Sequence, residues 1–120
     1  MADRTLTWFV KGVLSNSVLG QNVAESYVLD DDYVPVRVHL TLGSAADGEL
    51  PLVIDINMDG STIFGTKPSI GQGFLTQQAF GVFLSSLTTM DKDSVVTLDV
   101  DQVPSTPGSD MTVSLELDRA

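Results

Sequence analysis

The chain has 120 residues, of which 42% are hydrophobic, and it contains no cysteine. This length and apolar content predict one folded domain over residues 1–120, and the lack of cysteine excludes disulfides and thiolate chemistry. The formal charge is −10, and the 6 basic side chains are scattered, so we expect no binding to nucleic acid or to an anionic membrane. The sequence lacks a signal-peptide pattern and an apolar run near the roughly 20 residues of a membrane span, which predicts synthesis in a cytoplasm.

Apolar residues that alternate with polar ones, the pattern of half-buried strands, recur from the N-terminus onward. A first run covers residues 6–10 and a weaker one covers 24–29. The clearest run is 33–42, in which Pro35 lacks an amide hydrogen, so this strand is predicted to start at an edge or in a locally unpaired stretch. Its two predicted faces are Val34, Val36, Val38, Leu40 and Leu42 on the apolar side, and Tyr33, Pro35, Arg37, His39 and Thr41 on the polar side.

Further alternating runs cover 51–58, 94–103 and 110–117, with weaker strands expected at 61–65 and 74–84. Residues 81–90 are compatible with a short helical turn. Turn-forming sequences separate these runs at 30–32, 43–49, 59–60, 65–73, 88–94 and 103–110. The pattern predicts an all-β fold, an antiparallel β-sandwich of about eight strands, and both jelly-roll and immunoglobulin-like sandwiches fit it.

The stretch DINMDG at 55–60 matches the opening of a calcium-loop pattern, D-x-[DN]-x-[DN]-G. An EF-hand loop also needs flanking helices and a bidentate Glu at its twelfth position, which here is Thr66. Asp59 and Gly60 instead form a two-residue hairpin signal, because a type I′ turn needs positive φ at both central residues. We therefore predict a hairpin with two cross-strand pairs: Met58 with Ser61, and Ile56 with Ile63.

Two other acidic groups are candidate sites. Asp99 and Asp101 share one face of a predicted strand, about 7 Å apart, and paired carboxylates can bind metal or catalyse acid–base chemistry. We interpret them as a solvated outer face, and the run at 30–32 as a solvated corner. A bound ion would have to use Asp55, Asp59, Asp99 or Asp101, and we expect no metal site.

His39 is the sole histidine and shares a polar strand face with Arg37. Nucleophilic catalysis would need a serine beside it and a carboxylate behind it, and no sequence feature places a serine there. The GQG at 71–73 is too short for a phosphate loop. We expect no catalytic residue and no cofactor, and therefore a protein that is not an enzyme.

Seven aromatic residues are candidates for stacking on sugars, although their strand positions favour the core. Tyr33 is the best exposed candidate, because it begins a strand on the polar side. The full set is Trp8, Tyr27, Tyr33, Phe64, Phe74, Phe80 and Phe83.

Two stretches together resemble a small β-domain of tailed-bacteriophage structural proteins. They are LVIDINMDGSTIFGTKPSI at 52–70 and DSVVTLDVDQVPSTPGSDMTVSLEL at 93–117. The family pattern has an IDIN-x-x-G-x-x-IF hairpin, then a strand that begins with Gly-Asp and ends in DQ-(V/I)-GS. Here Lys92-Asp93 replaces the Gly-Asp and Pro104 replaces the later Gly, so two turns differ from the pattern.

The resemblance implies a jelly-roll-like sandwich on the virion, with synthesis in the host cytoplasm. A chain of one such domain is similar to head decoration or cement proteins, which bind the major capsid protein, often as homotrimers. The alternative is a receptor- or glycan-binding module of a tail fibre or baseplate. Contact elements are expected at residues 1–6, 43–49 and 104–110, and edge strands can also pair across subunits.

Overall fold

The computed structural model describes residues 2–14, 23–44, 46–48, 50–70, 76–79, 81–106 and 108–120, with backbone alone for 76–79. All regular structure in these residues is β-strand, which confirms the predicted all-β class. The strands are β1 (Arg4–Val13), β2 (Tyr27–Val28), β3 (Tyr33–Thr41), β4 (Leu52–Met58), β5 (Ser61–Thr62), β6 (Phe64–Thr66), β7 (Ser69–Ile70), β8 (Thr76–Ala79), β9 (Val82–Phe83), β10 (Val95–Gln102) and β11 (Ser109–Arg119).

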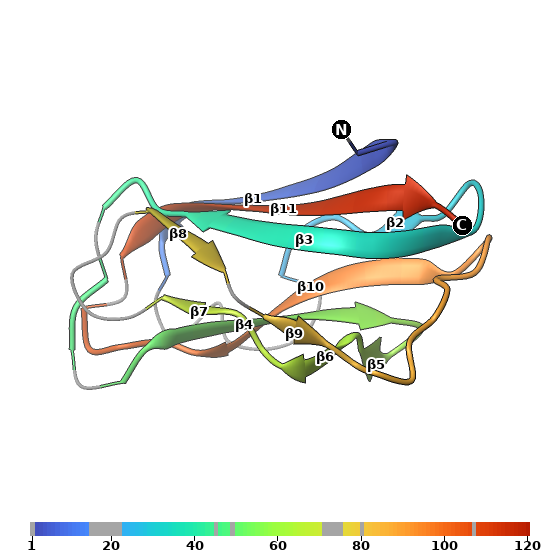
Figure 1. The fold of residues 1–120 in the computed structure, drawn as a ribbon. Coiled ribbons are helices and arrows are strands. Elements are labelled where there is room, and N and C mark those ends of the chain that lie inside the picture. Colours follow the sequence, from blue (N-terminus) through green and yellow to red (C-terminus); the bar gives the residue numbers. More distant parts are fainter. Residues whose placement is uncertain are drawn as a thin grey trace.

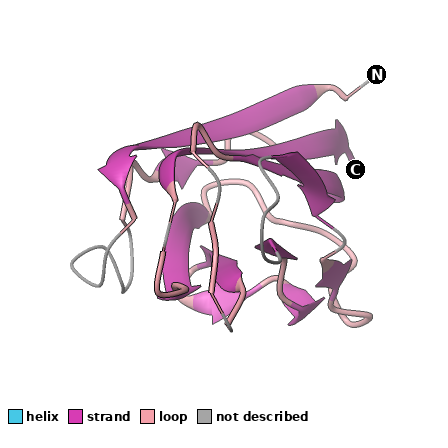
Figure 2. Cartoon of the chain, turned by 90° about the vertical axis from the view of Figure 1, so that its left-hand side faces the viewer, coloured by secondary structure: helices cyan, strands magenta, loops and turns pink. Residues whose placement is uncertain are grey.

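Two antiparallel sheets face each other across the core (Figures 1 and 2). The first has the order β1-β11-β3-β8, and the second has the order β2-β10-β4-β5, with β7 also paired to β4. Strands β6 and β9 form a separate small pair. The two chain ends lie at the same end of the molecule, where the Asp3 amide donates to the Leu117 carbonyl at 2.9 Å (Figure 1).

The core is built from one side of each long strand, as the alternation predicts. Trp8 and Leu115 point inward from the first sheet, and Ile54, Ile56 and Leu98 point inward from the second, all fully buried. The residues between them point outward and form an outer face on each sheet. The exposure of this face determines which of its side chains a ligand or partner could reach.

Strand β3 departs from the predicted alternation at its N-terminal end. Its pairing with β11 shifts between Arg37, opposite Glu116, and Pro35, opposite Leu117, so Val36 is an extra residue. This bulge reverses the faces before it, which makes the predicted orientation of Tyr33, Val34 and Val36 wrong. Val34 and Val36 are exposed, and Tyr33 is only 2% exposed.

Other strands are shorter or more divided than expected. The run at 24–29 gives only β2, and the run at 61–65 is split into β5 and β6. Residues 81–90, which were compatible with a short helical turn, contain β9, a hydrogen-bonded turn at 84–87 and a bridge from Met90 to Tyr33. The described residues therefore contain eleven strand segments rather than about eight, several of them two residues long.

The loops expected as exposed contact elements at 43–49 and 104–110 bond to each other. Ser44 bridges to Ser109, and Asp47 bridges to Thr106. Ala46 is 1% exposed, whereas Ser44, Asp47 and Thr106 are exposed, so the two loops together present one surface at this end of the sandwich.

Candidate functional site

The Asp59–Gly60 turn is the predicted hairpin. Both residues have positive φ, 53° and 85°, and Met58 pairs with Ser61. The Ile63 amide donates to the Ile56 carbonyl at 3.0 Å. The Asp59 carboxylate accepts from the Val95 amide at 2.9 Å, so it holds the turn against the start of β10.

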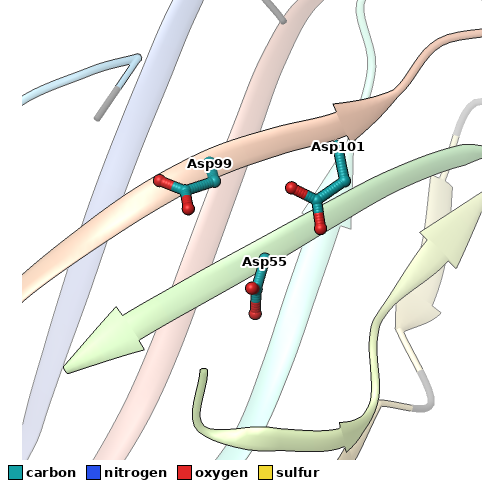
Figure 3. A group of neighbouring side chains, drawn as sticks. All are labelled: Asp55, Asp99 and Asp101. Carbon is teal, nitrogen blue, oxygen red and sulfur yellow. The ribbon is translucent and has the colours of Figure 1, made fainter. Parts of the chain in front are cut away.

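A cluster of three carboxylates lies on the outer side of β4 and β10, and Figure 3 shows Asp55, Asp99 and Asp101 as neighbours on these two strands. Asp55 and Asp99 are directly opposite each other on the paired strands, and Asp101 follows on β10. One ligand atom from each lies within 4.8 Å of the others. Asp59, the fourth candidate ligand from the sequence, is committed to the turn instead.

The predicted solvated outer face is wrong for Asp99, which is 4% exposed, and Asp55 is 5% exposed. The residues after the hairpin turn lie along the outer side of β4, where Thr62 and Lys67 contact the carboxylates. Apolar–polar alternation in the sequence predicts on which face of a strand a side chain lies. It does not predict whether another segment of the chain covers that face.

Each carboxylate of the cluster has a partner. Asp55 Oδ1 accepts from the Thr62 hydroxyl, and Asp99 Oδ2 accepts from the Asn57 side-chain amide. Lys67 Nζ donates to Asp101 Oδ2 at 2.6 Å and lies 3.6 Å from Asp55 Oδ2. A protein ammonium group therefore lies beside two of the three carboxylates, Asp55 and Asp101, and supplies positive charge there.

Burial is the largest influence on Asp55 and raises the pKa of its carboxyl group, while the Thr62 hydroxyl and Lys67 act in the opposite direction. The hydrogen bond to Asp101 raises the pKa of Lys67. Carboxylate oxygens suit hard cations such as Ca²⁺, but here Lys67 already supplies positive charge. Hydrolysis of a glycoside needs two carboxyl groups that the sugar can reach. Asp55 and Asp99 are almost fully buried, so these two residues do not suit sugar hydrolysis.

A second polar group lies on the outer face of the first sheet. Glu116 accepts from Arg37 Nε at 2.5 Å, and its Oε2 lies 2.8 Å from His39 Nε2. The hydrogen bonds from Arg37 and then His39 lower the pKa of Glu116. Ser114 is directly opposite His39, so the structure brings together a serine, a histidine and a carboxylate that sequence reasoning did not connect. The missing information was the pairing of β3 with β11.

This second group is not arranged for nucleophilic catalysis. The Ser114 hydroxyl lies 3.3 Å from the Thr7 hydroxyl, and no hydrogen bond joins it to His39 among the described contacts. The strands β1, β11 and β3 are paired side by side, so their amides serve the sheet rather than an oxyanion hole.

The acidic run at 30–32 is a structural corner. Asp30 accepts from the Tyr33 hydroxyl at 2.7 Å, a bond that is the main cause of its lowered pKa. Asp32 accepts from the Lys92 amide at 2.8 Å, and Asp31 lies 3.5 Å from Arg119. These bonds hold neighbouring loops and the C-terminal strand together.

Of the five proposed stacking aromatics whose side chains are described, three are buried. Trp8, Tyr33 and Phe64 are buried, which corrects the choice of Tyr33 as an exposed platform. Tyr27 and Phe83 are half-buried and pack against Trp8 and Phe64. Phe74, Phe80 and the GQG at 71–73 lie outside the residues whose side chains are described. Phe9, which was not among the expected stacking residues, is 53% exposed.

No protein-family model matches the chain, and a search of curated proteins finds no similar sequence. The described residues contain no helix that is long and apolar enough to cross a membrane.

Proposed function

We propose that the protein is a non-enzymatic virion structural protein, a decoration or cement protein that binds and stabilises the assembled head of a tailed bacteriophage. The observation that carries the proposal is the resemblance of residues 52–70 and 93–117 to phage structural domains. These two stretches supply β4, β10 and β11, the strands on which both sheets are built.

The sheet orders support the finer assignment of a jelly-roll-like sandwich. The first four strands alternate between the sheets, so that β1 and β3 lie in one while the short β2 and the long β4 lie in the other. The last two long strands, β10 and β11, then enter between strands already placed in each sheet. Interleaving of early and late strands is characteristic of jelly rolls, which are common in viral capsid proteins.

The charge of the chain is compatible with this role. A formal charge of −10 favours association with a basic capsid exterior. A protein that binds only the assembled shell stabilises that shell by mass action. The partner would be the major capsid protein, with the decoration protein as a homo-oligomer, a trimer by analogy with the family. Its location would be the virion, after synthesis in the host cytoplasm.

The alternative, a receptor- or glycan-binding module of a tail fibre or baseplate, loses its main candidate because Tyr33 is buried and bonded to Asp30. Immunogold labelling of intact particles separates the two functions. Label over the head is expected for decoration, label confined to the tail would favour the alternative, and no label on any particle would contradict both.

The cement role has a separate test. Particles stripped of the protein are expected to release their genome at a lower temperature than complete particles, and adding the protein back should restore the original temperature. Equal heat resistance of stripped and complete particles would contradict the cement role, even if labelling places the protein on the head.

A further inference from the structure

The chain contains the dipeptide Asp-Gly twice, at residues 47–48 and 59–60. In Asp-Gly the amide nitrogen of the glycine can attack the aspartate side chain and close a five-membered succinimide ring. Glycine favours this reaction because it has no Cβ to obstruct the approach of the nitrogen. The two dipeptides are equally open to the reaction by sequence, so a difference between them has to come from the fold.

The fold directs the two aspartate side chains to different amides. The Asp47 carboxylate accepts from the Gly48 amide, with 2.9 Å between the nitrogen and Oδ1. The Asp59 carboxylate instead accepts from the Val95 amide of β10, also at 2.9 Å. Reacting groups held about 3 to 3.5 Å apart gain much of the advantage of an intramolecular reaction. The structure therefore favours the reaction at Asp47 and disfavours it at Asp59.

Asp31 separates the contribution of the contact from that of the glycine. Its Oδ1 accepts from the amide of the next residue at 2.8 Å, which is the same contact as at Asp47. That next residue is Asp32, whose side chain obstructs ring closure. Asp31 therefore has the contact without the glycine, Asp59 has the glycine without the contact, and Asp47 has both.

Packing requires the glycine at position 48. Its φ is +142°, and a Cβ there would lie 2.6 Å from the Ser105 hydroxyl oxygen and 2.9 Å from the Ser105 amide nitrogen. Only glycine fits so close to a backbone atom in this conformation. The fold thus keeps, directly after Asp47, the residue that least obstructs ring closure. Asp47 is also exposed, so water can reach the ring and hydrolyse it.

From these observations we infer that Asp47 is a site of spontaneous isoaspartate formation in the folded protein. A bond forms between the Gly48 nitrogen and Asp47 Cγ, and the amide hydrogen leaves with the carboxyl hydroxyl as water. A second water then opens the succinimide at one of its two carbonyl carbons. Opening at Cγ restores aspartate. Opening at the main-chain carbon leaves isoaspartate, in which the main chain passes through Cβ and Cγ, and the mass of the protein is unchanged.

Isoaspartate at residue 47 alters the pairing of the loops at this end of the sandwich. Asp47 and Thr106 exchange two backbone hydrogen bonds, of 2.7 and 2.8 Å. In the isoaspartyl form the main-chain carbonyl of residue 47 has become a free carboxylate, and the chain is one atom longer. The Thr106 amide therefore loses its original acceptor, and the contact between the loops at 43–49 and 104–110 loosens as the protein ages.

Labelling of the folded full chain with heavy oxygen provides the test. The purified protein is incubated in water enriched in the heavy isotope of oxygen, so each succinimide that opens takes up one heavy atom. Digestion in ordinary water with trypsin and a protease that cuts after Glu gives one fragment for each aspartate that is compared. Trypsin does not cut before proline, so these fragments are 26–37, 38–49 and 50–92. Fragmentation in the mass spectrometer assigns each heavy oxygen to its residue.

We expect Asp47 to take up heavy oxygen at least about fivefold faster than Asp59 or Asp31, because it alone of the three combines the contact with the glycine. An isoaspartyl form of fragment 38–49 should accumulate as a second chromatographic peak of the same mass. Uptake at Asp47 that is no faster than at Asp59 would overturn the inference, as would a lack of uptake at Asp47.

Two controls separate the effect of the fold from that of the sequence. In urea the two Asp-Gly dipeptides lose their different contacts, so Asp47 and Asp59 should label within about twofold of each other. A difference of the original size that persists in urea would also overturn the inference. Asp47→Ala removes the reacting carboxyl group and should abolish uptake in fragment 38–49, with the other two fragments unchanged. The reaction needs no particle or partner, so its outcome is independent of the proposed function.

Discussion

The outer faces of the two sheets are alike in sequence and different in structure. Both consist of polar residues that alternate with core residues along long strands. On β4 and β10 the outward groups Asp55, Asn57 and Asp99 are buried under the segment that carries Thr62 and Lys67. On β1, β11 and β3 the outward groups remain accessible, with Phe9 more than half exposed. The polar face of a strand is therefore accessible to solvent only where no other segment of the chain covers it.

The largest expected effect is on the covered face. Asn57→Ala removes a donor to the buried Asp99 carboxylate, and the loss of a hydrogen bond to a charged group costs about 2 kcal/mol. Urea denaturation should show this loss in the free energy of unfolding. The matched change on the open face, Thr112→Ala, should cost less than about 1 kcal/mol. Equal losses would mean that the two faces do not differ energetically.

A smaller effect is expected from the one cation of the covered face. Lys67→Met removes the ammonium beside Asp55 and Asp101 but keeps most of the apolar stem. Because the Lys67 side chain is 42% exposed, solvent screening limits the expected loss to about 1 kcal/mol. Lys11→Met on the open face should change unfolding by less than about 0.5 kcal/mol. A Lys67→Met chain as stable as the original would show that the carboxylates need no internal cation.

The two faces should also respond oppositely to pH. Burial raises the pKa of Asp55 in the folded state, so its contribution to stability is full below its ordinary value of 3.8 and is lost as pH rises through the raised pKa. The pKa of Glu116 is lowered by Arg37, so its contribution is present above 4.5 and is lost as pH falls through the lowered pKa.

Chemical denaturation of Asp55→Asn and Glu116→Gln between acidic and neutral pH measures this difference. Relative to the original chain, Asp55→Asn should gain stability as pH rises. Glu116→Gln should match the original chain in acid and lose relative stability as pH rises. The same direction of change for both variants would contradict the assigned causes.

The smallest effect is expected at Ser114. Ser114→Ala removes a hydroxyl that contacts only Thr7 among the described residues, so unfolding should change by less than about 0.5 kcal/mol. Hydrolysis of an activated ester such as p-nitrophenyl acetate should be no faster with the protein than with the variant. Hydrolysis that disappears in Ser114→Ala would revive the arrangement of Ser114, His39 and Glu116 as a catalytic group.

Local features of the sequence predicted much of the fold. Asp59 and Gly60 specified their own turn, and the turn length then set the register of Met58 and Ser61. The inward residues of β1, β4, β10 and β11 followed from period-two alternation. These features depend on neighbours within a few residues along the chain.

The features that were missed depend on contacts between distant segments. The bulge in β3 arises where it pairs with β11, and it reversed the faces of Tyr33 and Val34. Burial of Asp99 depends on another part of the chain that crosses its face. The meeting of His39 with Ser114 depends on strand order, which a single sequence does not specify.

The position of β11 between β1 and β3 has a consequence for how the chain folds. The first sheet cannot join its two halves until residues 109–119 have been synthesised, because β1 and β3 meet only through that strand. Contacts between segments more than a hundred residues apart carry a large loop-closure entropy and slow folding. Insertion of β11 between β1 and β3 is therefore expected to be a late and slow step in the folding of this sheet.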